Sequence, residues 1–189
     1  MTRFRTTLIA AALAAAVIVP AQAAQTLNAG KSQIGFTFKQ MNTPSDGSFK
    51  RFAASVDFDP AKPEATKAEF TVDLASIDTG SPDGDSEAKK KAWFNTAATP
   101  KATFTAKSVK ALGNGKFEAR GPLTIKGVSR DIVSTFTAKQ SGAELQLDGS
   151  FPLLRLQYKL GDGDWADTGA VADEVLVKYR FVLSGKAGK

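Results

Sequence analysis

The stretch that decides the fold is Gly121–Arg130, which reads GPLTIKGVSR. It begins as an alternating strand in which Leu123 and Ile125 point to one face and the polar residues between and after them to the other. Gly127 supplies a turn residue, and residues 131–137 resume the alternation. Two alternating runs joined across a glycine predict an antiparallel hairpin.

Similar alternating runs occupy most of the chain on both sides of this hairpin. They lie at residues 33–39, 49–59, 68–78, 103–110, 116–125, 143–151 and 174–183. We count about eight or nine short strands, and residues 42–47 between the first two are dense in turn-forming residues. Helical composition, without β-branched residues, is confined to a short insertion around residues 86–94. A βαβ alternation is absent, so the sequence predicts one all-β domain, either a barrel or a sandwich.

The N-terminus has the pattern of a cleaved export signal. Arg3 and Arg5 precede an alanine-rich apolar run at residues 8–19, which Pro20 ends, and a small-residue pattern follows at residues 21–23. We therefore predict a signal peptide at residues 1–23 and a mature domain at residues 24–189. We expect the mature protein to be exported to the periplasm and to contain no integral membrane segment.

The composition removes several classes of function. The chain of 189 residues has no cysteine and no histidine, which excludes thiolate and imidazole metal sites and catalysis by Ser-His-Asp or Cys-His groups. The net charge is +6, and two of these charges belong to the predicted signal peptide. A charge this small and dispersed does not predict a nucleic-acid partner.

Acidic residues form two glycine-containing runs that we considered as cation or catalytic sites. They are residues 83–87, which read DGDSE, and residues 162–167, which read DGDWAD. Neither completes a calcium-binding loop, so solvated turns are the simpler interpretation. Without histidine, an enzyme would depend on an Asp or Glu of raised pKa inside the barrel. A hydrolase or isomerase that uses only carboxylates is therefore an alternative, and a stress-protective interaction protein with a solid core is another.

Phenylalanine is used far more often than the other aromatic residues. The chain has 13 Phe against 2 Tyr and 2 Trp, and most of the Phe fall on the inward positions of the predicted strands. Phe offers apolar area without a polar tip. These side chains form either an ordinary core or the wall of a cavity for a long apolar molecule, and composition leaves both open.

Several short motifs together resemble the YceI-like family of exported polyisoprenoid-binding proteins. Besides GPLTIKGV at residues 121–128, they are SQIGF at 32–36, GSF at 47–49 with Phe52, SIDTG at 76–80, WFN at 93–95 followed by Pro100, Thr103 and Phe104, and Arg155 followed by Tyr158, Gly161 and Trp165. The resemblance implies a lipocalin-like, eight-stranded antiparallel β-barrel whose tunnel holds an isoprenoid tail. Many relatives carry a histidine where this chain has residues 39–41, and an acid where it has Gln157.

The resemblance favours a tunnel over a solid core, so the inward apolar residues become predicted ligand contacts. These are Ile34, Phe36, Phe38, Phe49, Phe58, Phe70, Leu74, Trp93, Phe94, Phe104, Leu123, Ile125, Phe151, Leu160, Trp165 and Phe181. Gln40, Asn42 and Arg155 are predicted polar contacts at the mouth. The implied ligand is an isoprenoid lipid, either a ubiquinone-like quinone or a polyprenyl compound, with no cofactor and no metal. We predict a carrier or storage protein and not an enzyme, with a homodimer as a possible assembly.

Overall fold

A computed structural model describes residues 25–185, so the predicted signal peptide lies outside the described residues. The strands are β1 (Thr26–Leu27), β2 (Gln33–Gln40), β3 (Thr43–Phe49), β4 (Phe52–Asp57), β5 (Lys67–Asp73), β6 (Ile77–Asp78), β7 (Lys101–Thr105), β8 (Ser108–Gly113), β9 (Lys116–Ile125), β10 (Val128–Ser141), β11 (Glu144–Leu154) and β12 (Glu174–Ser184). One α-helix, α1 (Pro82–Lys89), accompanies the 3-10 turns η1 (Ala29–Lys31), η2 (Pro63–Ala65), η3 (Leu74–Ser76), η4 (Arg155–Tyr158) and η5 (Gly163–Ala166).

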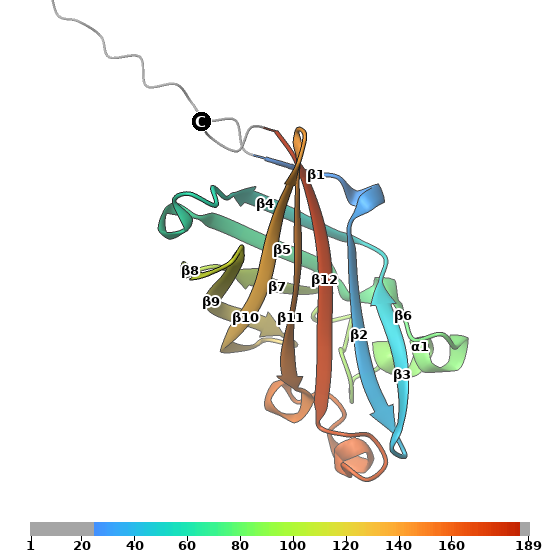
Figure 1. Cartoon of the computed structure of the whole chain (residues 1–189). Coiled ribbons are helices and arrows are strands. Elements are labelled where there is room, and N and C mark those ends of the chain that lie inside the picture. Colours follow the sequence, from blue (N-terminus) through green and yellow to red (C-terminus); the bar gives the residue numbers. More distant parts are fainter. Residues whose placement is uncertain (1–24, 186–189) are drawn as a thin grey trace, which may run out of the picture.

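The strands form one strongly curled antiparallel sheet. Its order is β4-β5-β7-β9-β10-β11-β12-β2-β3-β6, with β8 also paired to β9 and β1 to β12. Figure 1 shows β10, β11, β12 and β2 running down the front of the molecule, while β4, β5 and β7 cross behind them at a steep angle. The two groups of strands face each other across a common interior. The predicted all-β antiparallel barrel is therefore confirmed.

The opening hairpin is present, and its turn is tighter than the sequence suggested. Strands β9 and β10 pair from Val128 opposite Ile125 onward, so only Lys126 and Gly127 form the turn. Both have positive φ, at 50° and 74°, as a type I′ turn requires. Leu123 and Ile125 are buried on the inner face, as the alternation predicted.

Two sequence boundaries and the strand count differ from the prediction. Residues 43–47 belong to β3 and are not a loop, because Met41 and Asn42, both with positive φ, complete a two-residue turn after β2. The helix lies at residues 82–89 and not 86–94, since Ser81 caps its N-terminus and Pro82 occupies its first turn. Within residues 25–185 the sheet has twelve strands, because the predicted runs at 68–78 and 103–110 each form two strands and because β1 and β3 were not predicted as strands.

Gly121 in the opening stretch has a packing role that the pattern did not reveal. A Cβ atom at this position would lie 2.0 Å from the carbonyl oxygen of Thr105, where the chain passes from β7 to β8. The amide of Lys107 donates to the carbonyl of Arg120 at 2.8 Å in the same place. The absence of a side chain at Gly121 therefore lets β7 and β8 both pair with β9 around a bend.

Gln25 joins the edge strand β4 to the β1–β12 pair across the curled sheet. Strand β1 pairs with β12, and the next residue toward the N-terminus, Gln25, forms a bridge with Val56 on β4. The Gln25 side chain is 5% exposed. Its Nε2 donates to the Phe58 carbonyl and its Oε1 accepts from the Phe58 amide, both at 3.1 Å. The Gln25 side chain thus makes the two backbone hydrogen bonds with Phe58 that a neighbouring strand would otherwise make.

We expect Gln25→Ala to lower the free energy of unfolding by about 1–3 kcal/mol, because it leaves a buried amide and a buried carbonyl of Phe58 unpaired. Urea denaturation of the mature protein measures this. Gln157→Ala is a matched control, since Gln157 is exposed on η4, and it is expected to change stability by less than about 0.5 kcal/mol. Equal effects of the two variants would contradict the role of Gln25.

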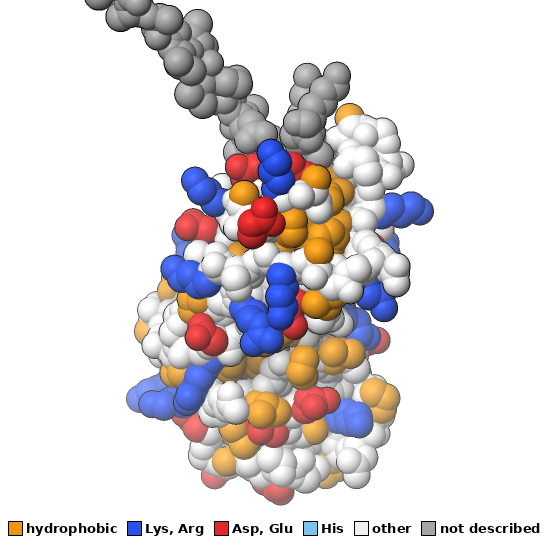
Figure 2. Space-filling model, turned by 60° about the vertical axis from the view of Figure 1, so that its left-hand side comes forward, with side chains coloured by type: hydrophobic (Ala, Val, Ile, Leu, Met, Phe, Trp, Pro, Cys, Tyr) orange, Lys and Arg blue, Asp and Glu red, His pale blue; other side chains and the backbone are white. Residues whose placement is uncertain are grey.

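The outer surface carries mixed charges. On the face shown in Figure 2, Lys and Arg side chains are interspersed with Asp and Glu. Several form exposed ion pairs, for example Arg180 with Asp148 at 2.7 Å and Arg51 with Asp73 at 2.9 Å. Among the described residues, no helix is long and apolar enough to cross a membrane.

Candidate ligand-binding cavity

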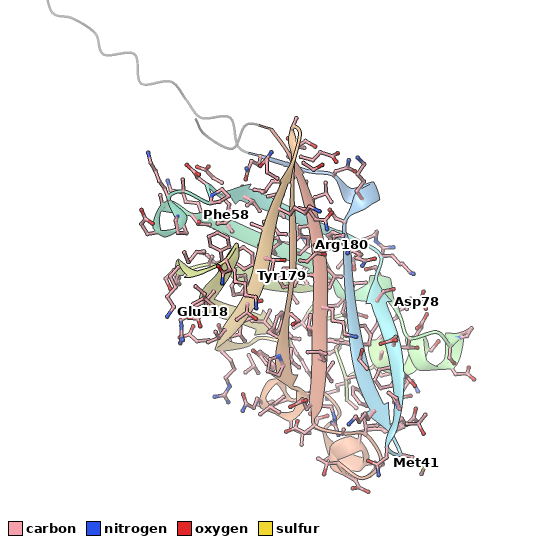
Figure 3. All side chains as sticks on the ribbon, in the orientation of Figure 1. Met41, Phe58, Asp78, Glu118, Tyr179 and Arg180 are labelled. Atoms are coloured by element: carbon pink, nitrogen blue, oxygen red, sulfur yellow. The ribbon has the colours of Figure 1, made fainter. Side chains whose placement is uncertain are left out.

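The curled sheet encloses an elongated cavity of about 730 Å³. Its wall is made by inward-pointing residues of β2, β5, β7, β9, β10, β11 and β12, and α1 contributes at one side. Of the residues predicted to contact a ligand, all except Asn42 line this cavity. Asn42 is exposed in the turn at the tip of the β2–β3 hairpin, next to Met41, which Figure 3 shows at the lower end of the molecule.

The upper end of the barrel is packed solid by a phenylalanine cluster. Phe58 contacts Phe117 with ring centroids 5.2 Å apart and Phe136 at 5.6 Å, and the rings of Phe117 and Phe136 stack at 5.4 Å. All three side chains are at most 8% exposed. This part of the phenylalanine set is an ordinary core, and it closes the cavity at that end.

The remaining inward phenylalanines surround the hollow. They are only partly buried although they point inward, because part of each ring faces the cavity. This group consists of Phe36, Phe38, Phe49, Phe70, Phe104 and Phe151. The same residue type therefore serves as core above and as cavity wall below, which the composition alone left open.

A stack of three aromatic rings crosses the barrel between these two regions. Phe70 on β5 stacks on Phe181 of β12 at 4.6 Å, and Phe181 stacks on Tyr179 at 4.9 Å. Figure 3 places Tyr179 near the middle of the barrel, below Phe58. The Tyr179 hydroxyl lies 2.8 Å from the Ser134 hydroxyl on β10. Burial raises the pKa of Tyr179 to about 12, so the phenol is neutral at physiological pH.

Arg155 lines the lower end of the cavity, and its hydrogen-bonding capacity is used by the backbone. The side chain is 1% exposed, and it donates to the carbonyls of Ala172 (3.1 Å), Leu160 (2.8 Å), Gly161 (3.0 Å), Trp165 (2.8 Å) and Val171 (2.7 Å). These bonds occupy all five N–H groups of the guanidinium. Burial lowers the pKa of Arg155, but an arginine stays charged. The residue thus holds the loop at residues 160–172 under the barrel and has no donor left for a head group.

Two tryptophans complete the lower end. The rings of Trp93 and Trp165 lie 5.7 Å apart, and the Arg155 guanidinium lies over the Trp93 ring at 5.3 Å. Lys126, in the turn of the opening hairpin, donates to the carbonyls of Ala92 at 3.1 Å and Lys159 at 2.5 Å. The turn after β9 therefore ties both loops to the barrel wall.

The polar part of the lining gathers where β3 meets α1. Gln40, Ser45, Thr79, Ser81, Asp83 and Glu87 all contribute to the cavity there. Asp85 fixes the start of the helix by accepting from the amide of Thr79 at 2.6 Å and from its hydroxyl at 2.8 Å. Because these residues are half-buried or exposed, this side is the mouth of the cavity. Among the sequence predictions, only Gln40 belonged to it.

The acidic runs do not form a metal site. Within residues 25–185 no group of three or more Asp and Glu residues is placed to hold an ion. The two carboxylates that line the cavity are Asp83, which is exposed, and Glu87, which accepts from Lys90 at 2.6 Å. A buried, unpaired carboxylate, the requirement for the enzymatic alternative, is not found among the described lining residues.

These features define a class of protein: a curled antiparallel barrel, closed at one end by Phe, around an apolar cavity with a small polar mouth. The chain belongs to the YceI-like family, because the model of the YceI-like domain matches residues 25–183.

Sequence relatives and solved structures agree with this assignment. The chain is 37% identical over 87 residues to a UPF0312 protein of Ectopseudomonas mendocina, and 36% identical over 96 residues to Protein YceI of Escherichia coli O157:H7. These matches cover 46% and 51% of this chain, and 46% and 49% of the relatives, so the chain matches about half the length of each.

Two solved structures match a larger share of the chain. BcnA of Burkholderia cenocepacia is 38% identical, has a TM-score of 0.81, and is matched over 82% of this chain and 98% of its own. A polyisoprenoid binding domain from Saccharophagus degradans has a TM-score of 0.69 at 16% identity, over 86% of this chain and 98% of its own, which shows a shared fold.

Proposed function

We propose that this protein is a periplasmic carrier or store for an isoprenoid lipid, which it holds in the barrel cavity. The observation that supports this most directly is the hollow itself. A cavity of about 730 Å³ walled by Phe, Leu, Ile and Val side chains matches a slim apolar molecule. Pockets for small ligands commonly measure about 300–1,000 Å³. The name of the Saccharophagus degradans domain, polyisoprenoid binding, adds support for this ligand class.

The physical basis of binding is removal of the apolar chain from water. Each Å² of apolar surface buried contributes about 25 cal/mol, so a long tail gains affinity along its length with little chemical selectivity. The packed cluster of Phe58, Phe117 and Phe136 limits how far the ligand extends upward.

The charges of the lining favour an uncharged head group. Among the described lining residues, Arg155 is the only Lys or Arg, and all its donors are used within the protein. Asp83 and Glu87 stand at the mouth through which a ligand enters, where they would repel a phosphate. We therefore infer that a quinone or a polyprenol binds more tightly than a polyprenyl phosphate.

The two other functions that the sequence left open have less support. The carboxylate-only enzyme lacks a buried acid in the described cavity wall, and the solid-core protein is at odds with the hollow. Carriage of a lipid by a binding protein accounts for the cavity and its apolar wall.

We expect the full chain, expressed with its N-terminus intact, to appear in the periplasmic fraction and to carry a co-purified lipid. Native mass spectrometry of gently purified protein gives the mass of the adduct. Delipidated protein is expected to take up a polyprenyl quinone, and more weakly a polyprenyl phosphate of equal chain length. Lipid-free protein that takes up neither compound would refute the proposed function, and retention in the cytoplasm would refute the location alone.

A further inference from the structure

A pair of hydroxyl groups lies on the apolar wall, away from the polar mouth. Tyr179 on β12 and Ser134 on β10 both line the cavity, and their oxygens are 2.8 Å apart. Their neighbours on the wall, such as Phe136, Leu147 and Phe181, are apolar. Thr66, another polar lining residue outside the mouth, donates to the carbonyl of Pro63 at 2.6 Å.

Gly149 creates the space that brings the two hydroxyls together. This residue lies on β11, the strand between β10 and β12, and is the register partner of Tyr179. A Cβ atom at Gly149 would lie 2.4 Å from the Tyr179 ring. The phenol ring therefore lies across the glycine and reaches Ser134 two strands away. Stacking on Phe181 fixes the ring from the other side, so the hydroxyl is held in place before any ligand binds.

The hydrogen bond between the two hydroxyls leaves the pair able to make one more hydrogen bond. The two hydroxyls share one hydrogen bond, so one of their two protons remains for another acceptor. The Ser134 hydroxyl has a second partner, the carbonyl of Ser150, at a long 3.4 Å. When Tyr179 donates to Ser134, the phenol oxygen accepts from a ligand hydroxyl. When Ser134 donates to Tyr179, the phenol proton is free for a ligand carbonyl or ether.

We propose that the Tyr179–Ser134 pair is an internal recognition point that hydrogen-bonds an uncharged oxygen atom of the bound lipid. The cavity then selects oxygen-bearing neutral isoprenoids, such as quinones and polyprenols, over isoprenoid hydrocarbons of the same length. This inference rests on the proposed lipid-binding function and specifies the chemistry of its ligand. A polar pair in an otherwise apolar wall contributes most to affinity when the ligand supplies a hydrogen-bond partner, because hydrogen bonds are stronger in apolar surroundings than in water.

A purely structural role for Tyr179 makes a different prediction. In that case the ring only fills the space over Gly149, and the hydroxyl only satisfies Ser134. Tyr179→Phe keeps the ring, the stack on Phe181 and the contact with Gly149, and removes only the hydroxyl. The variant therefore separates the two roles without emptying the site.

The test compares three probes on delipidated mature protein: a polyprenyl quinone, a polyprenol of similar chain length, and squalene, an isoprenoid hydrocarbon without oxygen. Quenching of Trp93 and Trp165 reports quinone binding directly, because both of the chain's tryptophans line the cavity. The polyprenol and squalene are measured by displacement of the quinone. We expect Tyr179→Phe to bind the quinone and the polyprenol roughly 3- to 10-fold more weakly and squalene unchanged.

Two further variants make the test specific. Ser134→Ala keeps the phenol but removes its partner, so its quinone affinity is expected to fall between those of the wild type and Tyr179→Phe. Tyr158→Phe is the matched control: Tyr158 is the other tyrosine, its buried hydroxyl has no hydrogen-bond partner, and it does not line the cavity. We expect Tyr158→Phe to leave all three affinities unchanged.

The outcomes distinguish this inference from the function on which it rests. An equal loss for quinone and squalene in Tyr179→Phe, or no loss for the quinone, overturns the recognition point while lipid binding stands. Wild-type protein that binds none of the three probes overturns the proposed function itself. A loss confined to the two oxygenated probes supports the inference.

Discussion

Phe104→Asp is expected to weaken lipid binding by at least about 100-fold while the barrel remains folded. Phe104 on β7 faces the hollow, where its ring is half-buried and lies 6.4 Å from that of Phe70. In the empty protein, water in the cavity can hydrate the new carboxylate. A bound apolar tail would displace that water, and the effective cost of desolvating an ion in a protein is several kcal/mol. This cost opposes binding more than it opposes folding.

The adjacent residue supplies the control for this prediction. Thr103 is on the same strand and is exposed on the outer face, so Thr103→Asp adds the same charge without entering the cavity. Quinone uptake, followed by tryptophan quenching, is expected to be lost in Phe104→Asp and retained in Thr103→Asp and Phe104→Leu. Circular dichroism in the near and far ultraviolet verifies the fold. A folded Phe104→Asp protein that takes up quinone as well as the wild type does would contradict the assignment of this cavity.

The fold was predictable because its signals are local. Alternation placed Leu123 and Ile125 on the inner face, and a glycine between two alternating runs predicted the hairpin that β9 and β10 form. The errors were also local: residues 43–47 contain Pro, Asp and Gly, which favour turns, yet pairing with β2 holds them in β3. Pairing between strands overrides the preferences of single residues when a neighbour supplies the hydrogen bonds.

The hollow was not predictable from pattern, because inward residues look the same around a core and around a cavity. Phe58 and Phe104 occupy inward positions in the predicted strands at residues 49–59 and 103–110, but only the first is fully buried. What separates them is how closely opposite walls approach, and that depends on the curvature of the whole sheet. The resemblance to a known family predicted the tunnel, and the structure showed that packed phenylalanine rings close one end of it.

Residues that act through the backbone have partners that the sequence does not reveal. Arg155 was predicted as a polar contact of the ligand, and in the structure it lines the cavity and donates to carbonyls spread over residues 160–172, which no sequence motif connects to it. Gln25 lies outside every predicted strand, whereas its side-chain amide binds the backbone of Phe58. Gly149 and Tyr179 lie on neighbouring strands and become one unit only in the observed register.

Arg155→Lys is expected to lower the free energy of unfolding by about 3–5 kcal/mol, the largest loss of stability that we predict. The guanidinium serves five carbonyls from a planar fork, and a lysine offers three donors from a single atom. At least two buried carbonyls are left unpaired, each at a cost of about 1–3 kcal/mol. Contact of the cation with the Trp93 ring is weakened as well.

The surface residue Arg180 provides the comparison. Its ion pair with Asp148, at 2.7 Å, involves side chains that are 47% and 37% exposed. Exposed pairs contribute up to about 1 kcal/mol, so Arg180→Lys is expected to change stability by less than this. Thermal and urea denaturation of both variants would measure the difference. Equal losses would mean that the five bonds of Arg155 contribute no more than a surface contact.

Because Arg155 holds a loop at one end of the cavity, Arg155→Lys also tests how the ligand dissociates. The loop that it holds carries Trp165 and Val171, which form part of the cavity wall below the tail. When the loop opens more often, the ligand dissociates faster, although the Phe wall that provides most of the apolar contact is unchanged. We therefore expect Arg155→Lys to raise the dissociation rate of a quinone and to increase hydrogen exchange at residues 156–172, with little change in β10. Faster exchange throughout the sheet would instead show that Arg155 stabilises the whole barrel and does not act as the clamp of one end.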